Sequence, residues 1–434
     1  MANEWRTVTL GEVLGPKGYI RGPFGSALKR GELLSEGVPV YEQQHAIYST
    51  RDFRFFIGKE KYQELARFTV QPNDLIISCS GTLGRVSVIR ERDPIGVISQ
   101  ALLILRPDVS YITPTFLFYI LSSPAGFHSM VSVSTGSVQV NIAKRSIIES
   151  IEINLPPLAE QKAIAAMLGS LDDKIELNRR MTTTLEATAR TLFQSWFVDF
   201  VPIYAKQGGE SATGQDPAIA AMFPERLEET PFGQAPQGWE VRSLDKAAHY
   251  LNGLALQKYP PGDGPTLPVI KIAQLRKGDT VGADRCNIQL PSAYIVQDGE
   301  VLFSWSGSLE VELWCGGLGA LNQHLFKVTS TEFPKWFYYL WTLHHLDEFR
   351  LIAAGKATTM GHIQRGHLTA AKVLIPPPAL LDSMTRIMSP LIEQIISSRI
   401  QSRSLATLRD TLLPKLLSGE IRIDGSRTLE SRDA

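Results

Sequence analysis

Three basic residues flank a glycine-rich turn near the N-terminus, a pattern that suits contact with phosphate groups. Arg21 precedes the sequence GPFGS at 22–26, and Lys29 and Arg30 follow it. Glycine in such a turn would let the backbone approach a phosphate closely, with the cations beside it. The alternative interpretation is a solvated loop that carries ordinary surface charges.

A polar group follows each of two matching apolar runs, VPV at 38–40 and LPVI at 267–270. The polar residues are Gln43, Gln44 and His45 in the first half, and Lys271, Gln274 and Arg276 in the second. An amide side chain can form two hydrogen bonds with adenine in the major groove of DNA, and arginine suits guanine. These residues are candidates for base contact, although an ordinary strand end that enters a loop would look the same.

Two Ser-Gly loops follow apolar strand candidates, at 80–82 and 306–308. The hydroxyl groups of Ser80 and Thr82, together with backbone amides, could bind phosphate. Plain turns between strands explain the same pattern equally well. Further polar candidates of this kind are Ser137, Gln139, Lys356, Gln364 and Arg365.

The chain lacks the motifs of enzymes that act on nucleotides or nucleic acids. It has no GxxxxGK[ST] phosphate loop, no Asn/Asp-Pro-Pro-aromatic methyltransferase motif and no glycine-rich cofactor loop after a strand. It has no acidic pair with a lysine at nuclease spacing, and His362 and His367 have no Glu or Cys at metal-ligand spacing. We therefore predict no catalytic residue, no metal site and no cofactor on this chain.

Apolar residues recur at spacings of four and three in two segments that lie 220 residues apart. They are Ile164, Leu168, Leu171, Ile175, Leu185, Leu192 and Trp196 in the first segment, and Met384, Met388, Leu391, Ile395, Leu405, Leu412 and Leu416 in the second. Such spacing forms the seam of a coiled coil, so it predicts two long paired helices over 158–198 and about 380–418. The first helix would be roughly 60 Å long. Pro390 predicts a kink or a break in the second helix.

The run LFQSWFVDF at 192–200, which includes Trp196 and Phe197, holds more apolar surface than one narrow seam can bury. This surplus favours docking of another subunit. The alternative is an internal pair of helices that acts only as a spacer.

Segments outside the long helices also occur twice in the same order. Trp5 matches Trp239, NDLIISCSGTLG at 73–84 matches DGEVLFSWSGSL at 298–309, and SQAL at 99–102 matches NQHL at 322–325. Short β-like runs broken by Gly, Asn, Asp and Pro predict mixed α/β (α+β) domains. The expected fold has two pseudo-repeated globular domains separated by two long antiparallel coiled-coil helices.

The expected boundaries follow from the same matches. They are 1–155 and 239–375 for the globular domains, 156–200 and 376–420 for the long helices, 201–238 for a linker and 421–434 for a tail. Within these, we expect a short helix over 217–222 and a strand over IRI at 421–423.

Composition places the chain among ordinary globular proteins. Lys+Arg and Asp+Glu both number 44, so bulk charge gives no nucleic-acid signal. Cys79, Cys286 and Cys315 form no CxxC pair and cannot all be bridged, which favours reduced thiols in the cytoplasm. The N-terminus shows no apolar signal core, and no apolar run approaches the length of a membrane span.

These segments together resemble the specificity (S) subunit of type I restriction–modification systems. The most specific stretch is LPPLAEQKAIAAMLGSLDDKIELNRRMTTTLEATARTLFQSWFVDF at 155–200, which is similar to the family's central conserved region. Further similar segments are GYIRGPFGSALKRGE at 18–32, SGTLGRV at 80–86, TGSVQVNI at 135–142 and AMFPERLEETPFGQAPQGWE at 221–240. The second domain lacks a good copy of GPFGSALK and of TGSVQVNI.

The resemblance implies a non-catalytic subunit that reads a split double-stranded DNA sequence through two target recognition domains. It also implies that the paired helices dock two methyltransferase (M) subunits, with restriction (R) subunits as further partners and no membrane. S-adenosylmethionine, ATP and magnesium would bind to those partner subunits. Two alternatives are a coiled-coil scaffold that does not read DNA, and a methyltransferase or nuclease with an unrecognised active site.

Overall fold

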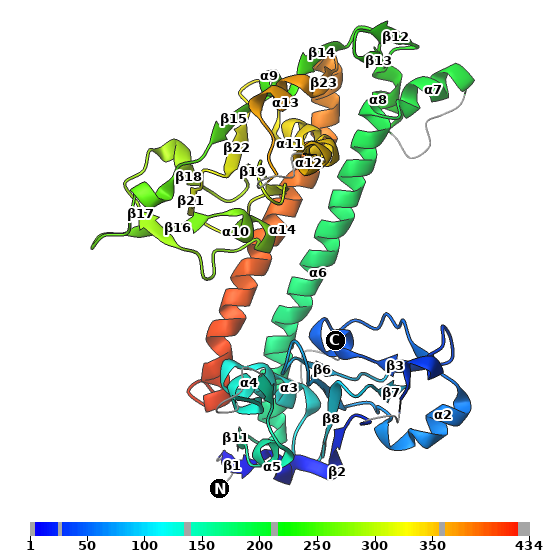
Figure 1. Cartoon of the computed structure of the whole chain (residues 1–434), viewed down its shortest axis with the longest axis vertical. Coiled ribbons are helices and arrows are strands. Elements are labelled where there is room, and N and C mark those ends of the chain that lie inside the picture. The colour runs from blue at the N-terminus through cyan, green and yellow to red at the C-terminus, as the bar shows by residue number, and fades with distance from the viewer. Residues whose placement is uncertain (1–4, 25–27, 134–139, 210–215, 356–360, 424–434) are drawn as a thin grey trace. The chain divides into compact units, whose positions relative to one another are not determined.

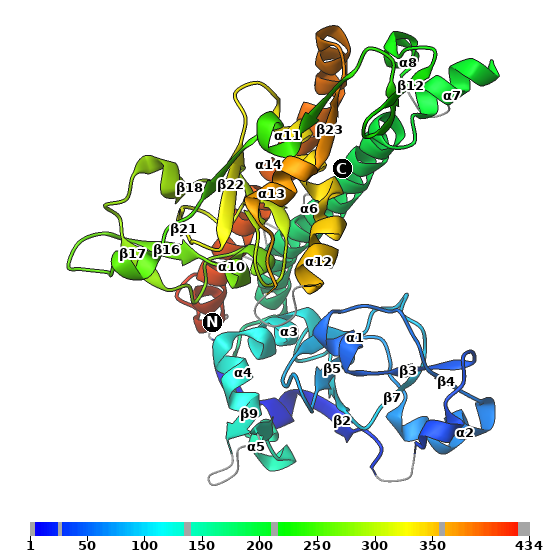
Figure 2. The same ribbon diagram turned by 45° about the horizontal axis from the view of Figure 1, so that its top comes forward.

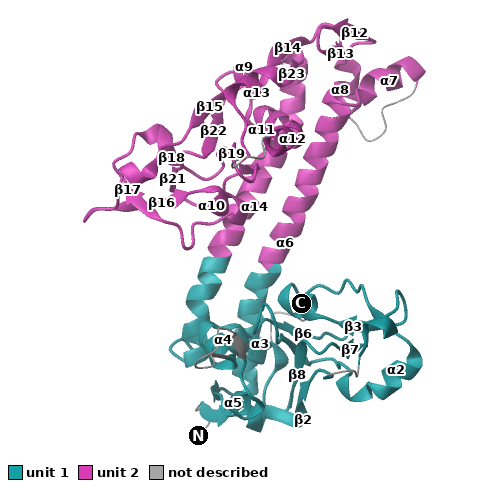
Figure 3. Cartoon of the chain, viewed as in Figure 1, with its two compact units in different colours: residues 1–173, 406–434 teal, residues 174–405 magenta. Residues whose placement is uncertain are grey.

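The computed structural model describes residues 5–24, 28–133, 140–209, 216–355 and 361–423, and every structural statement below concerns these residues. The chain divides into two compact units (Figure 3). Unit 1 comprises Met1–Asp173 and Ala406–Ala434, and unit 2 comprises Lys174–Leu405.

Unit 1 contains two main sheets. The larger sheet has the strand order β2-β8-β5-β6 with antiparallel neighbours, and the smaller has the order β4-β3-β7, in which β3 and β7 are parallel. Their bounds are β2 Leu14–Arg21, β3 Val38–Tyr41, β4 Phe56–Ile57, β5 Leu75–Ser78, β6 Val86–Val88, β7 Val97–Ile98 and β8 Leu102–Pro107. The smaller sheet lies near α2 (Lys59–Glu64) in both views (Figures 1 and 2).

The inner strands of the larger sheet, β5 and β8, are apolar at nearly every position because both of their faces are buried. On β5, Leu75 and Ile77 belong to one hydrophobic cluster, whereas Ile76 between them belongs to another. Successive side chains on a strand point to opposite faces. This burial on both sides explains why the run LIIS shows no alternation of apolar and polar residues.

Unit 2 repeats this sheet arrangement. Its sheets have the orders β15-β22-β19-β20 and β17-β16-β21-β18, and β16 and β21 are parallel as β3 and β7 are. The bounds are β15 His249–Asn252, β16 Thr266–Ile270, β17 Arg285–Asn287, β18 Ile295–Val296, β19 Val301–Ser304, β20 Val311–Leu313, β21 Gly319–Leu321 and β22 Leu325–Thr329. The duplication seen in the sequence is therefore a duplication of fold.

Smaller pairs of strands accompany each repeat. β1 (Arg6–Thr9) pairs with β11 (Glu152–Leu155), and β14 (Glu240–Ser243) pairs in the same way with β23 (Lys372–Ile375). The remaining strands and helices of unit 1 are β9 Val131–Val133, β10 Val140–Ile142, α1 Gln43–Ile47, α3 Pro114–Ser122, α4 Pro124–Met130 and α5 Arg145–Glu149. Those of the second repeat are α9 Leu244–Ala247, α10 Ile272–Lys277, α11 Lys335–His344, α12 Leu346–Ala354 and α13 Arg365–Ala370.

Two long helices continue from the repeats, α6 (Leu158–Phe197) with 40 residues and α14 (Pro378–Ser418) with 41. We expected a kink or a break at Pro390; a break is excluded because α14 runs through this residue. Pro390 and Arg386 are both exposed, so water can solvate the carbonyl group that loses its hydrogen bond to the proline. Among the described residues, no helix is both long and apolar enough to cross a membrane.

Polar contacts show that α6 and α14 pair in antiparallel directions within each unit. In unit 1, Arg409 Nη1 donates to Asp172 Oδ1 at 2.6 Å. In unit 2, Asn178 Nδ2 donates to Gln401 Oε1 at 2.8 Å, and Arg399 Nη2 donates to Glu186 Oε1 at 2.6 Å. Residue numbers that rise along α6 meet falling numbers along α14.

The predicted seam residues lie at the helix pairing surface or in the adjoining cores. Fully buried are Ile164, Leu168, Trp196, Phe197, Met384, Met388, Ile395 and Leu416, and half-buried are Leu171, Ile175, Leu185, Leu192, Leu391, Leu405 and Leu412. Ile164 and Leu168 share a hydrophobic cluster with Leu416 in unit 1. Leu185 and Leu192 pack against the main cluster of unit 2.

The segment 201–238, which we expected to be a linker, contains regular structure. Its elements are α7 Val201–Gly208, α8 Pro217–Met222, and the hairpin of β12 Leu227–Thr230 and β13 Gly233–Pro236. The short helix predicted over 217–222 is confirmed. Ile203 and Ile219 are buried in the main cluster of unit 2, so apolar anchors fix the segment to that unit.

The strand expected over 421–423 is wrong. In this segment Arg422 instead lies against the start of α6. Its guanidinium group donates to both carboxylate oxygens of Glu160, at 3.0 and 2.7 Å. Trp5 Nε1 also donates to Glu160 Oε2 at 3.0 Å. The two terminal segments of unit 1 therefore meet at one buried carboxylate.

Candidate nucleic-acid interface

The Ser-Gly loops of the two repeats are built by the same hydrogen bonds. Ser78 and Ser304, the last residues of β5 and β19, are fully buried. Their hydroxyl groups donate to the carbonyl oxygens of Thr82 and Ser308, each at 2.6 Å.

A backbone N–H from the following residues closes each loop, and the glycine at its tip adopts the left-handed conformation. Arg85 N donates to Ser78 Oγ at 2.9 Å, and Glu310 N donates to Ser304 Oγ at 2.7 Å. The φ angles are 61° at Gly81 and 66° at Gly307, a region that favours glycine. The loops are therefore rigid turns that expose their tips.

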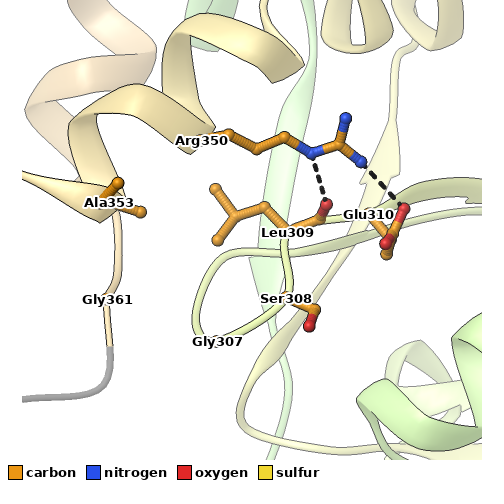
Figure 4. A pocket seen from close by; sticks show the side chains of 8 residues that line it. Gly307, Ser308, Leu309, Glu310, Arg350, Ala353 and Gly361 are labelled. Atoms are coloured by element: carbon orange, nitrogen blue, oxygen red, sulfur yellow. Dashed lines mark hydrogen bonds and ion pairs between the residues drawn. The ribbon is translucent and has the colours of Figure 1, made fainter.

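The second loop also lines an open pocket with α12 (Figure 4). Arg350 spans it, donating from Nε to the carbonyl oxygen of Leu309 at 3.2 Å and from Nη2 to Glu310 Oε2 at 3.1 Å. These contacts brace the loop against the helix. The side chain of Arg350 is partly exposed, and its guanidinium group lies at Leu309 and Glu310.

Two candidates from the sequence, Gln43 and Ser80, lie together. Gln43 is the first residue of α1, and its Nε2 donates to Ser80 Oγ at 2.7 Å. Its neighbour Gln44 donates from Nε2 to the carbonyl oxygen of Asp52 at 3.2 Å. Thr82 is exposed on the same loop as Ser80. The structure thus joins the amide group and the hydroxyl loop into one polar surface.

His45 lies inside the domain, so the prediction that its ring contacts a base is wrong for this arrangement. The ring is fully buried; Nδ1 accepts from Glu42 N at 2.7 Å, and Nε2 lies 3.2 Å from the carbonyl oxygen of Asp52. Burial lowers the pKa of His45 and favours the neutral ring. His45 caps α1 because its side chain reaches back to the N–H before the helix.

Gln274 occupies the equivalent capping position in the second repeat. Lys271 N donates to Gln274 Oε1 at 3.3 Å at the start of α10. The residue before each of these helices forms an ion pair, but the charge of that residue differs between the repeats. Glu42, before α1, is acidic and pairs with Arg54 at 2.8 Å, whereas Lys271, before α10, is basic and pairs with Asp284. Arg276 is exposed on α10. The two repeats thus present different charges at matching places.

The glycine of the first basic turn serves the fold of the domain itself. A Cβ atom on Gly22 would lie 2.1 Å from the carbonyl oxygen of Ser99, so the close approach is to this chain's own backbone. Gly25 falls outside the described residues. Lys29 and Arg30 are exposed, and Arg21 is half-buried with its guanidinium carbon 6.0 Å from the ring centroid of Phe24. Phe24 is 70% exposed and sits beside this cation.

The second repeat contains a copy of this turn that the sequence did not reveal. A Cβ atom on Gly253 would lie 2.2 Å from the carbonyl oxygen of Asn322. Gly22 N donates to Leu102 O at 2.9 Å, and Gly253 N donates to Leu325 O at 3.0 Å. Only the glycine is retained in NGLALQK at 252–258, so the usable signal was its pairing with the SQAL and NQHL motifs.

We expect Gly22→Ala and Gly253→Ala to destabilise their units by at least about 1–3 kcal/mol, because the backbone must move to admit the methyl group. Thermal unfolding of each variant measures the loss. Gly31→Ala and Gly262→Ala are matched controls, since a Cβ atom there meets nothing within 4 Å. Equal melting temperatures for all four variants would contradict the assignment.

The remaining predicted residues fall into two groups. Gln364 and Arg365 are exposed at the start of α13, where Arg365 lies over the ring of Phe326 at 5.8 Å and donates from Nη2 to the carbonyl oxygen of Tyr250 at 3.4 Å. Ser137, Gln139 and Lys356 lie outside the described residues.

The aromatic surplus at the end of α6 is not available to another subunit. Trp196 and Phe197 are 1% and 2% exposed in the main cluster of unit 2, where Phe197 contacts the rings of Trp239 and Trp336. Their assignment as docking residues is therefore wrong, because the core of the second repeat buries them. The long helices instead expose a separate set of apolar residues, Met167, Leu177 and Leu408.

The cysteines are buried thiols. Burial raises the pKa of Cys79 to about 12, so its reactive thiolate form is disfavoured. Among the described residues no group of three or more His, Cys, Asp or Glu side chains could hold a metal ion.

Comparisons with known proteins point to relatives of one kind. The sequence profile of the type I restriction modification DNA specificity domain matches residues 3–187. The MjaIX specificity subunit of Methanocaldococcus jannaschii is 25% identical over 354 residues, which cover 78% of each chain. The HindI specificity subunit of Haemophilus influenzae is 23% identical, covering 75% of this chain and 81% of that one.

The fold has a counterpart among solved structures. The crystal structure of the type I restriction–modification S subunit from M. genitalium superposes with a TM-score of 0.54 at 15% identity, covering 95% of this chain and 96% of that one. The two proteins share a fold of two β-rich α/β domains with two long helices packed together. By the profile match and these relatives, the chain is similar to the specificity subunits of type I restriction–modification systems. It is a non-catalytic subunit, and in this family catalysis and cofactors reside on the methyltransferase and restriction subunits.

Proposed function

We propose that this subunit reads a two-part double-stranded DNA target, one part with each recognition domain. The observation that carries the proposal is the pair of repeats with matching four-stranded sheets, β2-β8-β5-β6 and β15-β22-β19-β20, and different polar side chains at matching places. Equal folds would approach DNA in the same way. Different side chains at the contact surface would then select different bases.

The proposed contact residues combine phosphate and base chemistry. They are Arg21, Lys29, Arg30, Gln43, Gln44, Ser80 and Thr82 in the first domain, and Lys271, Arg276, Gln364 and Arg365 in the second. The cations suit phosphates, which position a protein on the duplex, whereas the amides suit base edges. His45 and Gln274 support these surfaces as helix caps.

We further propose that two methyltransferase subunits dock on α6 and α14, with restriction subunits joining the complex, which would assemble in the cytoplasm. Met167, Leu177 and Leu408 are 42%, 52% and 47% exposed on these helices, so they offer apolar surface outside the seam. A continuous helix of 40 residues is about 60 Å long. That length exceeds the roughly 34–36 Å between half-sites one DNA turn apart.

Exchange of one domain tests the proposal. Replacing residues 1–155 with the matching domain of a relative should change one half of the methylated sequence and preserve the other half and the gap. The reciprocal exchange of 239–375 is the control, and it should change only the opposite half. The measurement is methylome sequencing of cells that carry each chain with its methyltransferase. An exchange that alters both halves, or neither, contradicts two independent readers.

A further inference from the structure

The Ser-Gly loop of the first repeat anchors one amide. The amide nitrogen of Gln43, Nε2, carries two hydrogens and donates one of them to Ser80 Oγ. Among the described residues no other hydrogen bond occupies this side chain. One N–H and the carbonyl oxygen of Gln43 are therefore presented together at the surface, in an orientation fixed by the serine.

The corresponding serine of the second repeat also holds a glutamine, through a histidine. Ser306 Oγ lies 2.9 Å from His324 Nδ1, and Gln323 Nε2 lies 3.3 Å from His324 Nε2. An amide nitrogen only donates, so His324 Nε2 accepts from Gln323. The neutral ring then carries its proton on Nδ1 and donates it to Ser306 Oγ. The chain of contacts leaves Gln323 one N–H and its carbonyl oxygen.

The backbone of Gln323 is held as firmly as its side chain. Its N–H donates to the carbonyl oxygen of Leu254 at 2.9 Å, and its carbonyl oxygen accepts from Trp305 Nε1 at 3.2 Å. Trp305 Nε1 also donates to Asn252 Oδ1 at 2.9 Å. Gln323 is half-buried in the loop between β21 and β22, whereas Gln43 begins α1, so the two repeats reach the same chemistry from different elements.

We infer that Gln43 and Gln323 are the adenine-reading residues of the two domains, and that Ser80 and the Ser306–His324 pair are positioning residues. The inference rests on the proposed function. An N–H beside a carbonyl oxygen matches the N7 acceptor and N6 donor of adenine in the major groove. Anchoring removes rotamer freedom before DNA binds, which reduces the entropy lost on binding.

Substitution of each glutamine in the full chain, assembled with its methyltransferase, tests the reading role by methylome sequencing. Gln323→Ala should relax a single position in one half-site, and that position should be an A·T pair in the wild-type target. The preference there should fall by roughly 5- to 150-fold, the factor that one paired contact supplies. Gln43→Ala should do the same in the other half-site only.

A change of chemistry makes the test sharper. Gln323→Glu offers only acceptor oxygens, which suit the amino group of cytosine, so the relaxed position should shift from adenine toward cytosine. Gln63→Ala on α2 and Gln289→Ala, which lies before the short 3-10 helix Ser292–Tyr294, are matched controls on exposed glutamines, and both half-sites should survive them. A relaxed position that was a G·C pair, or no relaxed position, overturns the inference.

Substitution of His324 separates positioning from mere support of the fold. His324→Ala should relax the same base position as Gln323→Ala, and His324→Asn, which retains a donor and an acceptor, should restore part of the preference. If methylation disappears, binding of the purified complex to duplexes with single base changes replaces the methylome readout. Equal weakening on every duplex then counts against the inference.

The inference and the proposed function fail in different ways. A wild-type methylation pattern that is not bipartite, or does not depend on this chain, would remove the proposed function. If the pattern is bipartite but Gln43→Ala and Gln323→Ala leave every base of it unchanged, only the assignment of these glutamines as adenine-reading residues would be removed.

Discussion

Replacing Arg106 by methionine is expected to destabilise unit 1 by about 3–5 kcal/mol, because the buried carboxylate of Asp74 is left without its counter-charge. The side chain of Asp74 is fully buried at the start of β5. Arg106 on β8 donates from Nε and Nη2 to its two carboxylate oxygens at 2.7 and 2.8 Å. Methionine retains an unbranched apolar side chain in place of the aliphatic part of arginine and removes both donors, so the carboxylate of Asp74 loses its counter-charge.

The pH dependence of this loss follows from the pKa of Asp74. Burial raises that pKa above its usual value, although Arg106 opposes the shift. The native state therefore takes up the proton more readily than the unfolded chain. This proton uptake stabilises the native state fully at pH values below the ordinary pKa of aspartate. The stabilisation is lost as the pH rises through the raised pKa of Asp74. Without Arg106 the cost should be greatest at neutral pH and smaller in acid.

Urea unfolding at several pH values measures both effects. The double variant Asp74→Asn with Arg106→Met removes the stranded charge and should recover part of the stability. Arg54→Met is the matched control, because Arg54 is 65% exposed in its pair with Glu42 and such pairs contribute about 0–1 kcal/mol. A loss for Arg106→Met no larger than the control's would refute the role given to the buried pair.

The repeated architecture was predictable because it depends on patterns that local chemistry imposes. The four–three spacing placed the long helices within two residues of their observed ends, 158–197 and 378–418. The Ser-Gly loops could be aligned because a buried serine and a left-handed glycine recur at the same interval after an apolar strand. Both signals are short-range, so they survive divergence of the surrounding loops.

The parts that could not be predicted depend on contacts between distant segments. His45 looks like a base-reading residue beside two glutamines, and only the fold shows that the N–H of Glu42 and the carbonyl group of Asp52 engage its ring. Phe197 looked unsatisfied because its ring contacts Trp336 and Trp341, which lie far along the chain in α11.

Gln323 was visible in the NQHL match, but its role depends on a serine 17 residues earlier in the chain. Gly253 likewise belongs to a recognisable turn only because Asn322 packs against it. The sequence alone predicts the strands and helices of each domain. It does not predict which residues lie at the surface, because that depends on contacts between strands from different parts of the chain.

The seam between the long helices should be far more sensitive to charge than the surface beside it. Leu168→Asp and Met167→Asp place the same carboxylate on adjacent residues of α6. Leu168 is fully buried in a cluster with Ile164, Leu413 and Leu416, whereas Met167 is 42% exposed. An unpaired buried carboxylate costs several kcal/mol, to which the lost leucine burial adds about 2–3 kcal/mol.

Because globular domains are stable by only about 5–15 kcal/mol, Leu168→Asp should abolish cooperative folding of unit 1 and with it co-purification of the methyltransferase. Met167→Asp should melt within a few degrees of the wild type, since exposed substitutions change stability little. The proposed docking surface predicts that it nevertheless weakens methyltransferase binding. Thermal unfolding and co-purification of both variants separate the two effects. Normal assembly by Leu168→Asp would rule out the seam as the element that holds the helices together. Undiminished methyltransferase binding by Met167→Asp would remove that residue from the docking surface.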